Sequence, residues 1–270
     1  MVPDASQGPE ATTREGGGHF VQSLARGLAV IAAFDDRHPA MTLSDVARRT
    51  GLTRATARRF LLTLEELGYV RSDGRQFELT AKVLELGYSY LSALSLPELV
   101  TPHLRKLSDQ VQESCSVAVL DGPDIVYVAR VQMRHIMNVA ISVGTRFPAH
   151  ATSMGRVLLA DLSNDDAVAR CGQHLGEHQL ARTVSTPHEL IRRLDEVRRR
   201  GYAVVDQELE AGLRSVAVPL KDSAGKTVAA ANVSMRVGAS PAADDPVGQI
   251  LPALQQCAAA VHQDLVASAV

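Results

Sequence analysis

Five arginine residues lie close together between positions 48 and 59 of this 270-residue chain, and no acidic residue separates them. A helix that enters the major groove of duplex DNA carries short polar and cationic side chains on its exposed side and apolar residues on the side that packs against its own domain. The spacing therefore favours DNA binding. An arginine-rich helix can also be a solvated face or a protein-binding surface. The five residues are Arg48, Arg49, Arg54, Arg58 and Arg59.

The sequence around these arginines predicts two short helices, a tight turn and a two-stranded wing within residues 42–80. Gly51 supplies the turn between the helices, because glycine adopts left-handed backbone conformations at little cost. The second helix begins near Thr53, and Asp73-Gly74 forms the hairpin turn of the wing. This order of elements is that of a winged helix-turn-helix.

We expect the second helix to contact duplex DNA through the side opposite its apolar residues, and the wing to reach the backbone or the minor groove. Residues 21–80 contain nine Arg and seven Asp or Glu, whereas the whole chain has a net charge of −2. Positive charge is thus concentrated on one small module, as expected of a protein that docks on DNA through one face. The expected contacts are Thr53, Arg54, Thr56, Arg58 and Arg59 in the helix and Arg75 in the wing.

We divide the chain into four parts: a disordered leader at 1–18, the winged helix-turn-helix at 19–80, a linker helix at 81–96 and a second domain at 97–270. The leader is polar and rich in Gly and Pro. The linker helix is apolar over most of its surface, so it must be covered. It packs either against a second copy of itself, giving a homodimer, or against its own chain.

A helix before the two DNA-reading helices is predicted at Ser23–Phe34, with an apolar stripe that closes the small core. The second domain alternates strands and helices, with a third strand at 138–143 and an irregular segment at 144–155. Neighbouring antiparallel strands with helices outside predict an α/β domain that has one concave sheet face.

Two segments of the second domain resemble one known family. They are GTRFPAHATSMGRVLLA (144–160) and RRRGYAVVDQELEAGLRSVAVPL (198–220), followed by Asn232-Val233-Ser234. Together with the order of elements, they resemble the IclR family of bacterial transcription regulators, and within it the PcaR/PobR-like branch that regulates protocatechuate, 4-hydroxybenzoate and β-ketoadipate metabolism. The resemblance covers the chain from Phe20 to about Leu265.

The resemblance implies an α+β protein with a winged helix-turn-helix, a linker helix and a C-terminal GAF-like effector-binding domain with an antiparallel sheet. Such proteins are homodimers or pairs of dimers on palindromic operators, and they bind a small organic acid. Carried over position by position, the effector site would comprise the amides of Ser153 and Met154, the side chains of Ser215, Asn232 and Ser234, and Leu213 on its apolar wall. In one family member an acidic residue contacts the ligand, and that residue aligns here with Val205, whose neighbour is Asp206. Because a shift of one residue in a strand reverses the face of a side chain, either Val205 or Asp206 could face the site.

The residues themselves also predict an anion site near Gly155. Backbone N–H groups at a helix start lack intrahelical partners, and the helix dipole favours an anion there. Arg134 and Arg146 flank the predicted third strand, and either could neutralise a second carboxylate by a bidentate contact. The alternative for each is a surface salt bridge.

The motifs of nucleotide-binding proteins and serine hydrolases are missing, and we expect no enzyme activity, cofactor or metal site. The three cysteines have no metal-ligand spacing, and we expect buried thiols in a cytoplasmic protein without a membrane span. Glu208 and Glu210 are expected to be solvated loop residues. The alternative to an effector-controlled regulator is a small-molecule-binding enzyme or sensor domain fused to a DNA-binding module.

Overall fold

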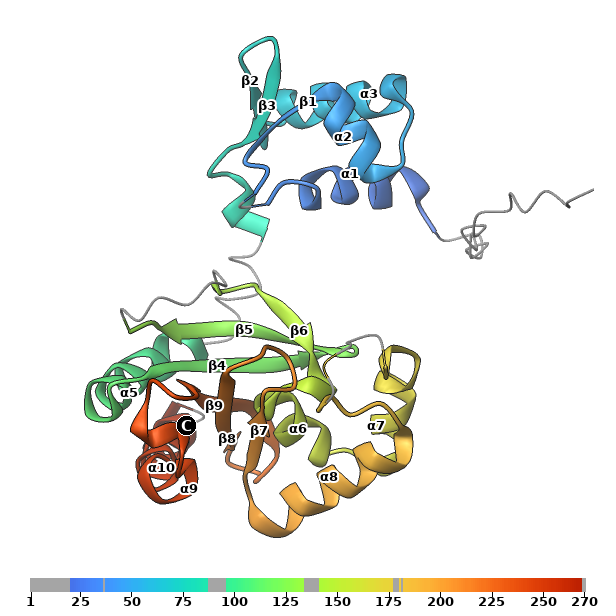
Figure 1. Ribbon diagram of the computed structural model, residues 1–270. Helices are drawn as coiled ribbons and strands as arrows, with labels where there is room; N and C mark the ends of the chain where they lie inside the picture. The colour runs from blue at the N-terminus through green and yellow to red at the C-terminus, as the bar shows by residue number, and fades with distance from the viewer. Residues whose placement is uncertain are drawn as a thin grey trace, which may run out of the picture. The chain divides into compact units, whose positions relative to one another are not determined.

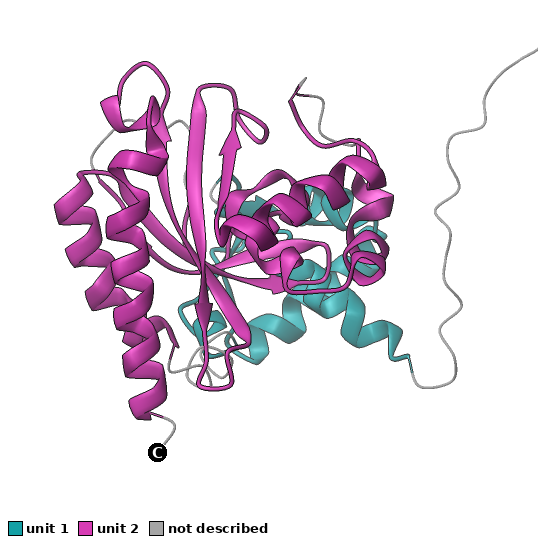
Figure 2. Ribbon diagram, turned by 90° about the horizontal axis from the view of Figure 1, so that it is seen from below, with its two compact units in different colours: residues 1–90 teal, residues 91–270 magenta. Residues whose placement is uncertain are grey.

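The computed structural model describes residues 20–35, 37–86, 96–133, 141–176, 180 and 182–268. The chain divides into two compact units, Met1–Tyr90 and Leu91–Val270 (Figure 2). The predicted leader at 1–18 and residues 87–95 of the predicted linker helix lie outside the described residues. No helix in the described part of the chain is both long and apolar enough to cross a membrane.

The N-terminal unit is a winged helix-turn-helix, as the sequence predicts. Three antiparallel strands in the order β1-β3-β2 form its small sheet, and the β2–β3 hairpin is the wing (Figure 1). The elements are α1 (Gln22–Ala32), β1 (Ala40–Thr42), α2 (Leu43–Thr50), α3 (Arg54–Glu66), β2 (Val70–Ser72) and β3 (Gln76–Leu79).

Local signals explain the ends of α2. The Thr42 hydroxyl accepts a hydrogen bond from the Asp45 amide, and the Asp45 carboxylate accepts one from the Thr42 amide, which makes a capping box. Gly51 ends the helix at φ 66°, in the left-handed region that favours glycine.

The apolar stripe predicted for the first helix is only partly in the core. Val30 is fully buried there, whereas Leu24 and Leu28 are 62% and 52% exposed. The prediction that the whole stripe closes the core of its own unit is therefore wrong. Because large aliphatic side chains are costly to leave in water, this face of α1 is a candidate for contact with a partner.

The C-terminal unit contains a six-stranded antiparallel sheet in the order β6-β5-β4-β9-β8-β7 (Figure 1). Its strands are β4 (Ser114–Asp121), β5 (Asp124–Val131), β6 (Arg146–Pro148), β7 (Ala203–Asp206), β8 (Leu213–Lys221) and β9 (Thr227–Arg236). Its helices are α5 (Leu96–Val111), α6 (Ser153–Ala160), α7 (Asn164–Cys171), α8 (Pro187–Arg200), α9 (Pro246–Gln249) and α10 (Leu251–Ser268), with 3-10 turns η1 (Ala149–Ala151), η2 (Gly172–His174) and η3 (Pro241–Ala243).

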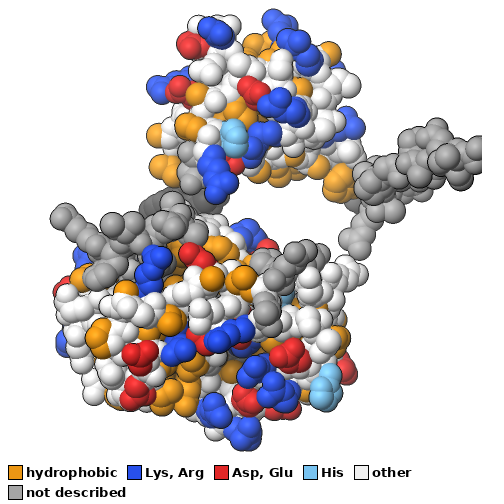
Figure 3. All heavy atoms as spheres, viewed as in Figure 1, with side chains coloured by type: hydrophobic (Ala, Val, Ile, Leu, Met, Phe, Trp, Pro, Cys, Tyr) orange, Lys and Arg blue, Asp and Glu red, His pale blue; other side chains and the backbone are white. Residues whose placement is uncertain are grey.

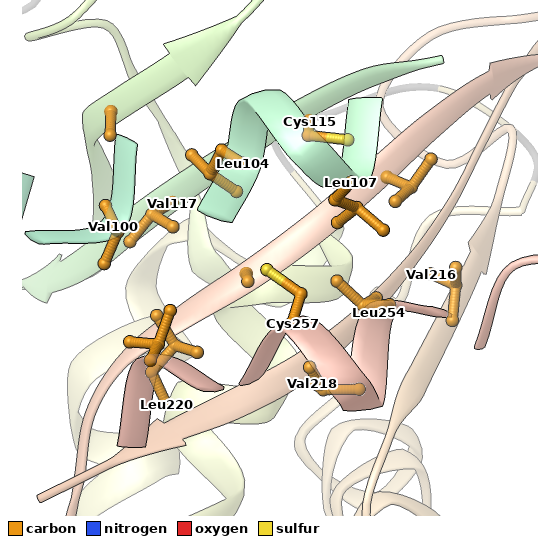
Figure 4. Close-up of a cluster of buried hydrophobic side chains, with 14 of the residues drawn as sticks. Val100, Leu104, Leu107, Cys115, Val117, Val216, Val218, Leu220, Leu254 and Cys257 are labelled. Atoms are coloured by element: carbon orange, nitrogen blue, oxygen red, sulfur yellow. The ribbon is translucent and has the colours of Figure 1, made fainter. Parts of the chain in front are cut away.

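Helices cover both faces of this sheet. On one face, α5 and α10 pack against alternate residues of β4, β8 and β9. Val117 of β4 and Val218 of β8 are labelled in Figure 4, and Val233 of β9 belongs to the same cluster. On the other face, α6 lies over β4, β9 and β8, and α8 packs on α6. Because side chains alternate between faces along a strand, β4, β8 and β9 each contribute to both cores.

The predicted third strand differs from the structure. Residues 134–140 lie outside the described part, residues 141–143 form no strand, and the strand that pairs with β5 is β6 at Arg146–Pro148. The strand pairs Ile125 with Phe147, and the edge-to-face contact between Phe147 and Tyr127 adds to this packing.

Candidate functional site

Helix α3 presents cationic side chains on its exposed side. Arg54, Arg58 and Arg59 are exposed, and Ala57 and Leu61 on the opposite side are fully buried. Lys and Arg side chains are spread over the face of the N-terminal unit seen in Figure 3. A helix with this division can dock in a groove of DNA without disturbing its own core.

Thr53 and Thr56 set the start of α3. The Thr53 hydroxyl accepts a hydrogen bond from the Thr56 amide at 3.2 Å, and the two hydroxyls lie 2.9 Å apart. Thr53 is therefore the N-cap of the helix, and its predicted contact with DNA would be additional to that role.

Ion pairs separate these five arginines and Arg75 of the wing into two groups. Arg48 binds Asp45 and Arg49 binds Asp35, each at 2.6 Å. In the described part of the chain, Arg54, Arg58, Arg59 and Arg75 take part in no ion pair. The second group is thus available to phosphates and base edges without breaking a contact within the unit.

Two rows of polar side chains cross the face of the large sheet that α6 covers. In the first row, Arg130 on β5 pairs with Ser116 on β4, which pairs with Asn232 on β9. In the second row, Ser114, Ser234 and Ser215 are neighbours on β4, β9 and β8. Residues directly opposite each other on antiparallel strands share a face of the sheet. Ala118, Ala217 and Ala230 each lie two residues from a member of these rows on the same strand, and they belong to the core under α6. Both rows therefore face α6.

The N-terminus of α6 lies over the second row. The hydroxyls of Ser153 and Ser215 are 2.8 Å apart, and both residues are buried. Thr152 caps the helix by accepting a hydrogen bond from the Gly155 amide at 3.0 Å. The amides of Ser153 and Met154 belong to the first turn, where no intrahelical acceptor exists. These donors are therefore placed to bind an anion.

Gly155 allows η1 to cross α6 closely. A Cβ atom at this position would lie 2.1 Å from the carbonyl oxygen and 2.4 Å from the Cα of Ala149. Backbone atoms cannot move aside as a flexible side chain can, so only glycine fits. The close crossing holds Thr152 and Ser153 at the start of the helix.

The structure brings five of the residues predicted for the effector site to one place. Asn232 donates a hydrogen bond from Nδ2 to the Ser234 hydroxyl at 3.2 Å, and Ser234 neighbours Ser215. Leu213 is half-buried and lies two residues before Ser215, on the same face of β8. Arg134 lies outside the described residues. The five are Ser153, Met154, Ser215, Asn232 and Ser234.

The sequence reasoning missed Arg130. Its Nη1 donates to the Ser116 hydroxyl at 3.1 Å, whereas its Nε and Nη2 are buried without a hydrogen-bond partner among the described residues. Asn232 Oδ1 is likewise buried without a hydrogen-bond partner among the described residues. Burial lowers the pKa of Arg130 below its ordinary value. Unsatisfied buried polar atoms are rare, and they mark a place where a ligand can be bound.

A β-bulge explains why Arg130 was missed. Val117 pairs with Ala129 but Ala118 pairs with Tyr127, so Val128 is an extra residue in β5. Simple alternation from Tyr127 would place Arg130 on the opposite face of the sheet. The bulge reverses the alternation and turns Arg130 toward the face under α6. The one sequence signal was an arginine inside the apolar run of β5.

Arg146 and Asp206, two other residues considered from sequence, make contacts elsewhere. Arg146 binds Asp121 at 2.7 Å and Asp124 at 3.3 Å, so it is a surface salt bridge. Val205 pairs with Ser215 and shares its face, whereas Asp206 pairs with Arg214 on the other. The hydrogen bond from Arg214 holds the pKa of Asp206 below its usual value.

Glu208 is buried, and the expectation that it is solvated is wrong. Arg156 on α6 donates from Nη1 to Glu208 Oε1 at 2.8 Å and from Nη2 to Oε2, and its Nε donates to the His150 carbonyl at 3.1 Å. The loop between β7 and β8 is thereby attached to α6, three residues after Ser153.

Comparison with known proteins gives the same architecture. Residues 23–74 match the IclR helix-turn-helix domain, and residues 88–263 match the C-terminal domain of the bacterial transcriptional regulator IclR. The chain belongs to the IclR family. It is thus a DNA-binding transcription regulator, and the family comprises regulators, which excludes the enzyme alternative.

Three relatives of this IclR-family chain are informative. The Pca regulon regulatory protein of Pseudomonas putida is 47% identical over 224 residues, which cover 81% of this chain and 76% of that protein. A transcriptional regulator from Rhodococcus sp. RHA1 is 55% identical, with a TM-score of 0.80, and the match covers 93% of this chain and all of that one. An IclR homolog from Microbacterium hydrocarbonoxydans, solved with 4-hydroxybenzoate, is 26% identical with a TM-score of 0.77, and the match covers 90% and 98%.

Proposed function

We propose that this IclR-family regulator binds operator DNA under the control of a small organic acid of the protocatechuate/β-ketoadipate pathway. One carboxylate binds the amides of Ser153 and Met154, and the polar body of the acid lies between Ser215, Asn232 and Ser234. The observation that carries the proposal is the buried polar cluster under the N-terminus of α6, where Asn232 Oδ1 lacks a partner among the described residues.

Two relatives support this class of effector. The Pseudomonas putida relative is a Pca regulon regulatory protein, and the Microbacterium relative was solved with 4-hydroxybenzoate. A helix N-terminus suits the carboxylate that such acids share, because the helix dipole favours an anion at that end. The hydroxyl and amide side chains provide hydrogen bonds for the remaining polar groups.

We propose that α3 reads the operator in the major groove. The contacts are the six residues expected from sequence, and the exposure of the arginines of α3 and of Arg75 supports them. The hairpin carrying Arg75 is held by Asp73, which accepts hydrogen bonds from the Arg75 amide at 2.8 Å and the Gln76 amide at 2.7 Å. The protein acts in the cytoplasm, where its operator DNA is found.

We propose that two copies associate through α1 and the start of the linker segment 81–96. Large apolar side chains are exposed in both places: Phe20, Val21, Leu24 and Leu28 in the first, Leu84 and Leu86 in the second. A second copy covers this surface symmetrically and places two heads on half-sites about one helical turn apart, or a multiple of that. Pairs of dimers are a further assembly on the same plan.

The segment 81–96 joins the two units along the chain and is our proposed route of control. An effector changes operator affinity only by binding one arrangement of the heads better than another, and a tenfold shift needs about 1.4 kcal/mol of differential affinity. Its start is attached to the N-terminal unit, where Lys82 Nζ donates to the Leu67 carbonyl at 3.0 Å.

Thermal-shift screening of the full chain tests the effector class directly. Protocatechuate, 4-hydroxybenzoate, β-ketoadipate and glyoxylate are added separately, and a ligand at ~100 times its dissociation constant adds about 2.7 kcal/mol to stability. We expect one of the first three to raise the Tm and to change operator affinity without being turned over. A response to glyoxylate alone would contradict the proposed class. Sedimentation as a monomer at micromolar concentration with full operator affinity would contradict the dimer.

A further inference from the structure

Arg130 is a half-buried cation on the sheet face under α6, and it forms no ion pair in the described part of the chain. Its Nη1 donates to Ser116 Oγ, and its two other guanidinium nitrogens are buried without hydrogen-bond partners in the parts of the chain that the structure describes. A guanidinium whose nitrogens are removed from water without an anion nearby is less stable than one that is paired. The arrangement is therefore suited to a ligand that brings a negative charge to this position.

The position of Arg130 relative to α6 limits the shape of such a ligand. Ser116, which Arg130 contacts, lies on β4, two strands away from Ser215 on β8 and one row further along the sheet. With strands ~4.8 Å apart and a two-residue step of ~7 Å, the two places are about 12 Å apart. Two hydrogen bonds of ~2.8 Å leave roughly 6 Å between the two ends of the ligand.

We propose that Arg130 is a second anion-binding residue of the effector site and selects acids that carry a second acidic group at the end remote from α6. This inference rests on the proposed effector site, in which the first carboxylate binds the Ser153 and Met154 amides. An extended dicarboxylate of four to six carbons spans roughly 6–9 Å between its outermost oxygens. Asn232, between the two ends in the first row, has its unpartnered Oδ1 available to a donor in the middle of the ligand.

Matched acids on the full chain test the role of Arg130. Isothermal titration compares adipate, which has two carboxylates, with hexanoate, which has the same chain length and one. We expect the wild type to bind adipate at least about tenfold more tightly, equivalent to about 1.4 kcal/mol. Arg130→Gln should reduce this preference to within about twofold. Arg146→Gln is the control, because Arg146 is an arginine of the neighbouring strand β6 that pairs with Asp121 and Asp124; it should keep the full preference.

The outcomes separate this inference from the proposed effector site. Binding of hexanoate that Asn232→Leu abolishes supports the site itself, and the adipate preference reports on Arg130. If Arg130→Gln keeps the preference, or if the wild type binds the two acids equally or binds neither, the role of Arg130 is overturned. Arg130→Met gives an independent measurement. The Tm of the ligand-free protein should change little, because the lost hydrogen bond to Ser116 Oγ is offset by removal of a guanidinium without a counter-charge, whereas a large fall would show that Arg130 holds the fold and not a ligand.

Discussion

Arg156 and Glu208 form an ion pair in the interior of the C-terminal unit, with side chains only 2% and 6% exposed. The pair joins α6 to the loop between β7 and β8, and Thr183 Oγ1 donates to the Glu208 carbonyl at 2.5 Å from a third segment. Because Arg156 lies one turn after Ser153, the position of the helix N-terminus depends on this pair. The sequence places these residues 52 positions apart, and neither belongs to the predicted site.

Glu208→Gln should strongly destabilise the C-terminal unit. It removes the negative charge and leaves the Arg156 guanidinium buried, and breaking a buried pair in this way costs about 3–5 kcal/mol. Urea unfolding of the full chain measures the change. The control is Glu78→Gln, which breaks the exposed pair with Arg71 and should cost at most ~1 kcal/mol. Equal effects of the two variants would contradict the buried pair.

Gly155→Ala should disrupt the start of α6. The added Cβ meets the backbone of Ala149 at 2.1 Å, so η1 and α6 must separate, at a cost of about 1–3 kcal/mol or more. Gly172→Ala is the matched control in the same unit, since a Cβ there meets only Val168 Cγ1 at 3.8 Å and its φ is −59°. The Tm of Gly155→Ala should fall, and that of Gly172→Ala should stay or rise. A fall of the same size in both would refute the close crossing.

The sequence was sufficient for features that depend on local signals. Gly51 marked the turn of the helix-turn-helix, and Asp73-Gly74 marked the wing, because each residue type has a specific backbone preference. The helix α8 (Pro187–Arg200) also begins and ends at local signals, since Thr186 and Pro187 mark its start and Gly201 its end. The α+β architecture follows from the order of such elements.

Features that depend on tertiary contacts could not be predicted. Arg130 reaches the site only because a β-bulge at Val128 changes the face of the strand, and one extra residue has no sequence signal of its own. Glu208 resembles a solvated loop residue until Arg156 is placed beside it. Leu24 and Leu28 look like core residues because apolar periodicity does not say which molecule covers the face.

Arg54→Ala and Arg58→Ala should each weaken operator binding by ~1–3 kcal/mol if the side chain reads a base. A phosphate contact would instead weaken all sequences alike and flatten the dependence on salt. Titration of labelled operator and of a scrambled duplex at two salt concentrations distinguishes the two. Arg192→Ala, an exposed helix arginine of the C-terminal unit paired with Glu196, is the control and should change neither. Unchanged affinity in both α3 variants would show that this helix is misplaced.

The three thiols should be inert in the native protein at pH 8. Burial raises the pKa of Cys171 and Cys257 to about 11 and also raises the pKa of Cys115. Since the thiolate is the reactive form, reaction should begin only as the pH approaches these raised values. Titration with a disulfide reagent should label three thiols per chain in denaturant and essentially none without it. Rapid labelling of the native protein at pH 8 would contradict their burial.

Asn232→Leu should abolish the effector response and leave operator binding by the ligand-free protein largely intact. The side chain is 3% exposed and its Nδ2 donates to Ser234 Oγ, so leucine removes both polar atoms from the middle of the proposed site at similar volume. Operator binding depends on the other compact unit. Operator titration with and without the acid that raises the wild-type Tm measures both properties. The control is Asn164→Leu, at a half-buried position of the same unit where the side chain accepts a hydrogen bond from Arg198 and lies outside the proposed site. An unchanged response would show that the effector binds elsewhere. Loss of operator binding together with a lowered Tm would show that Asn232 holds the fold, which would contradict its assignment to the ligand.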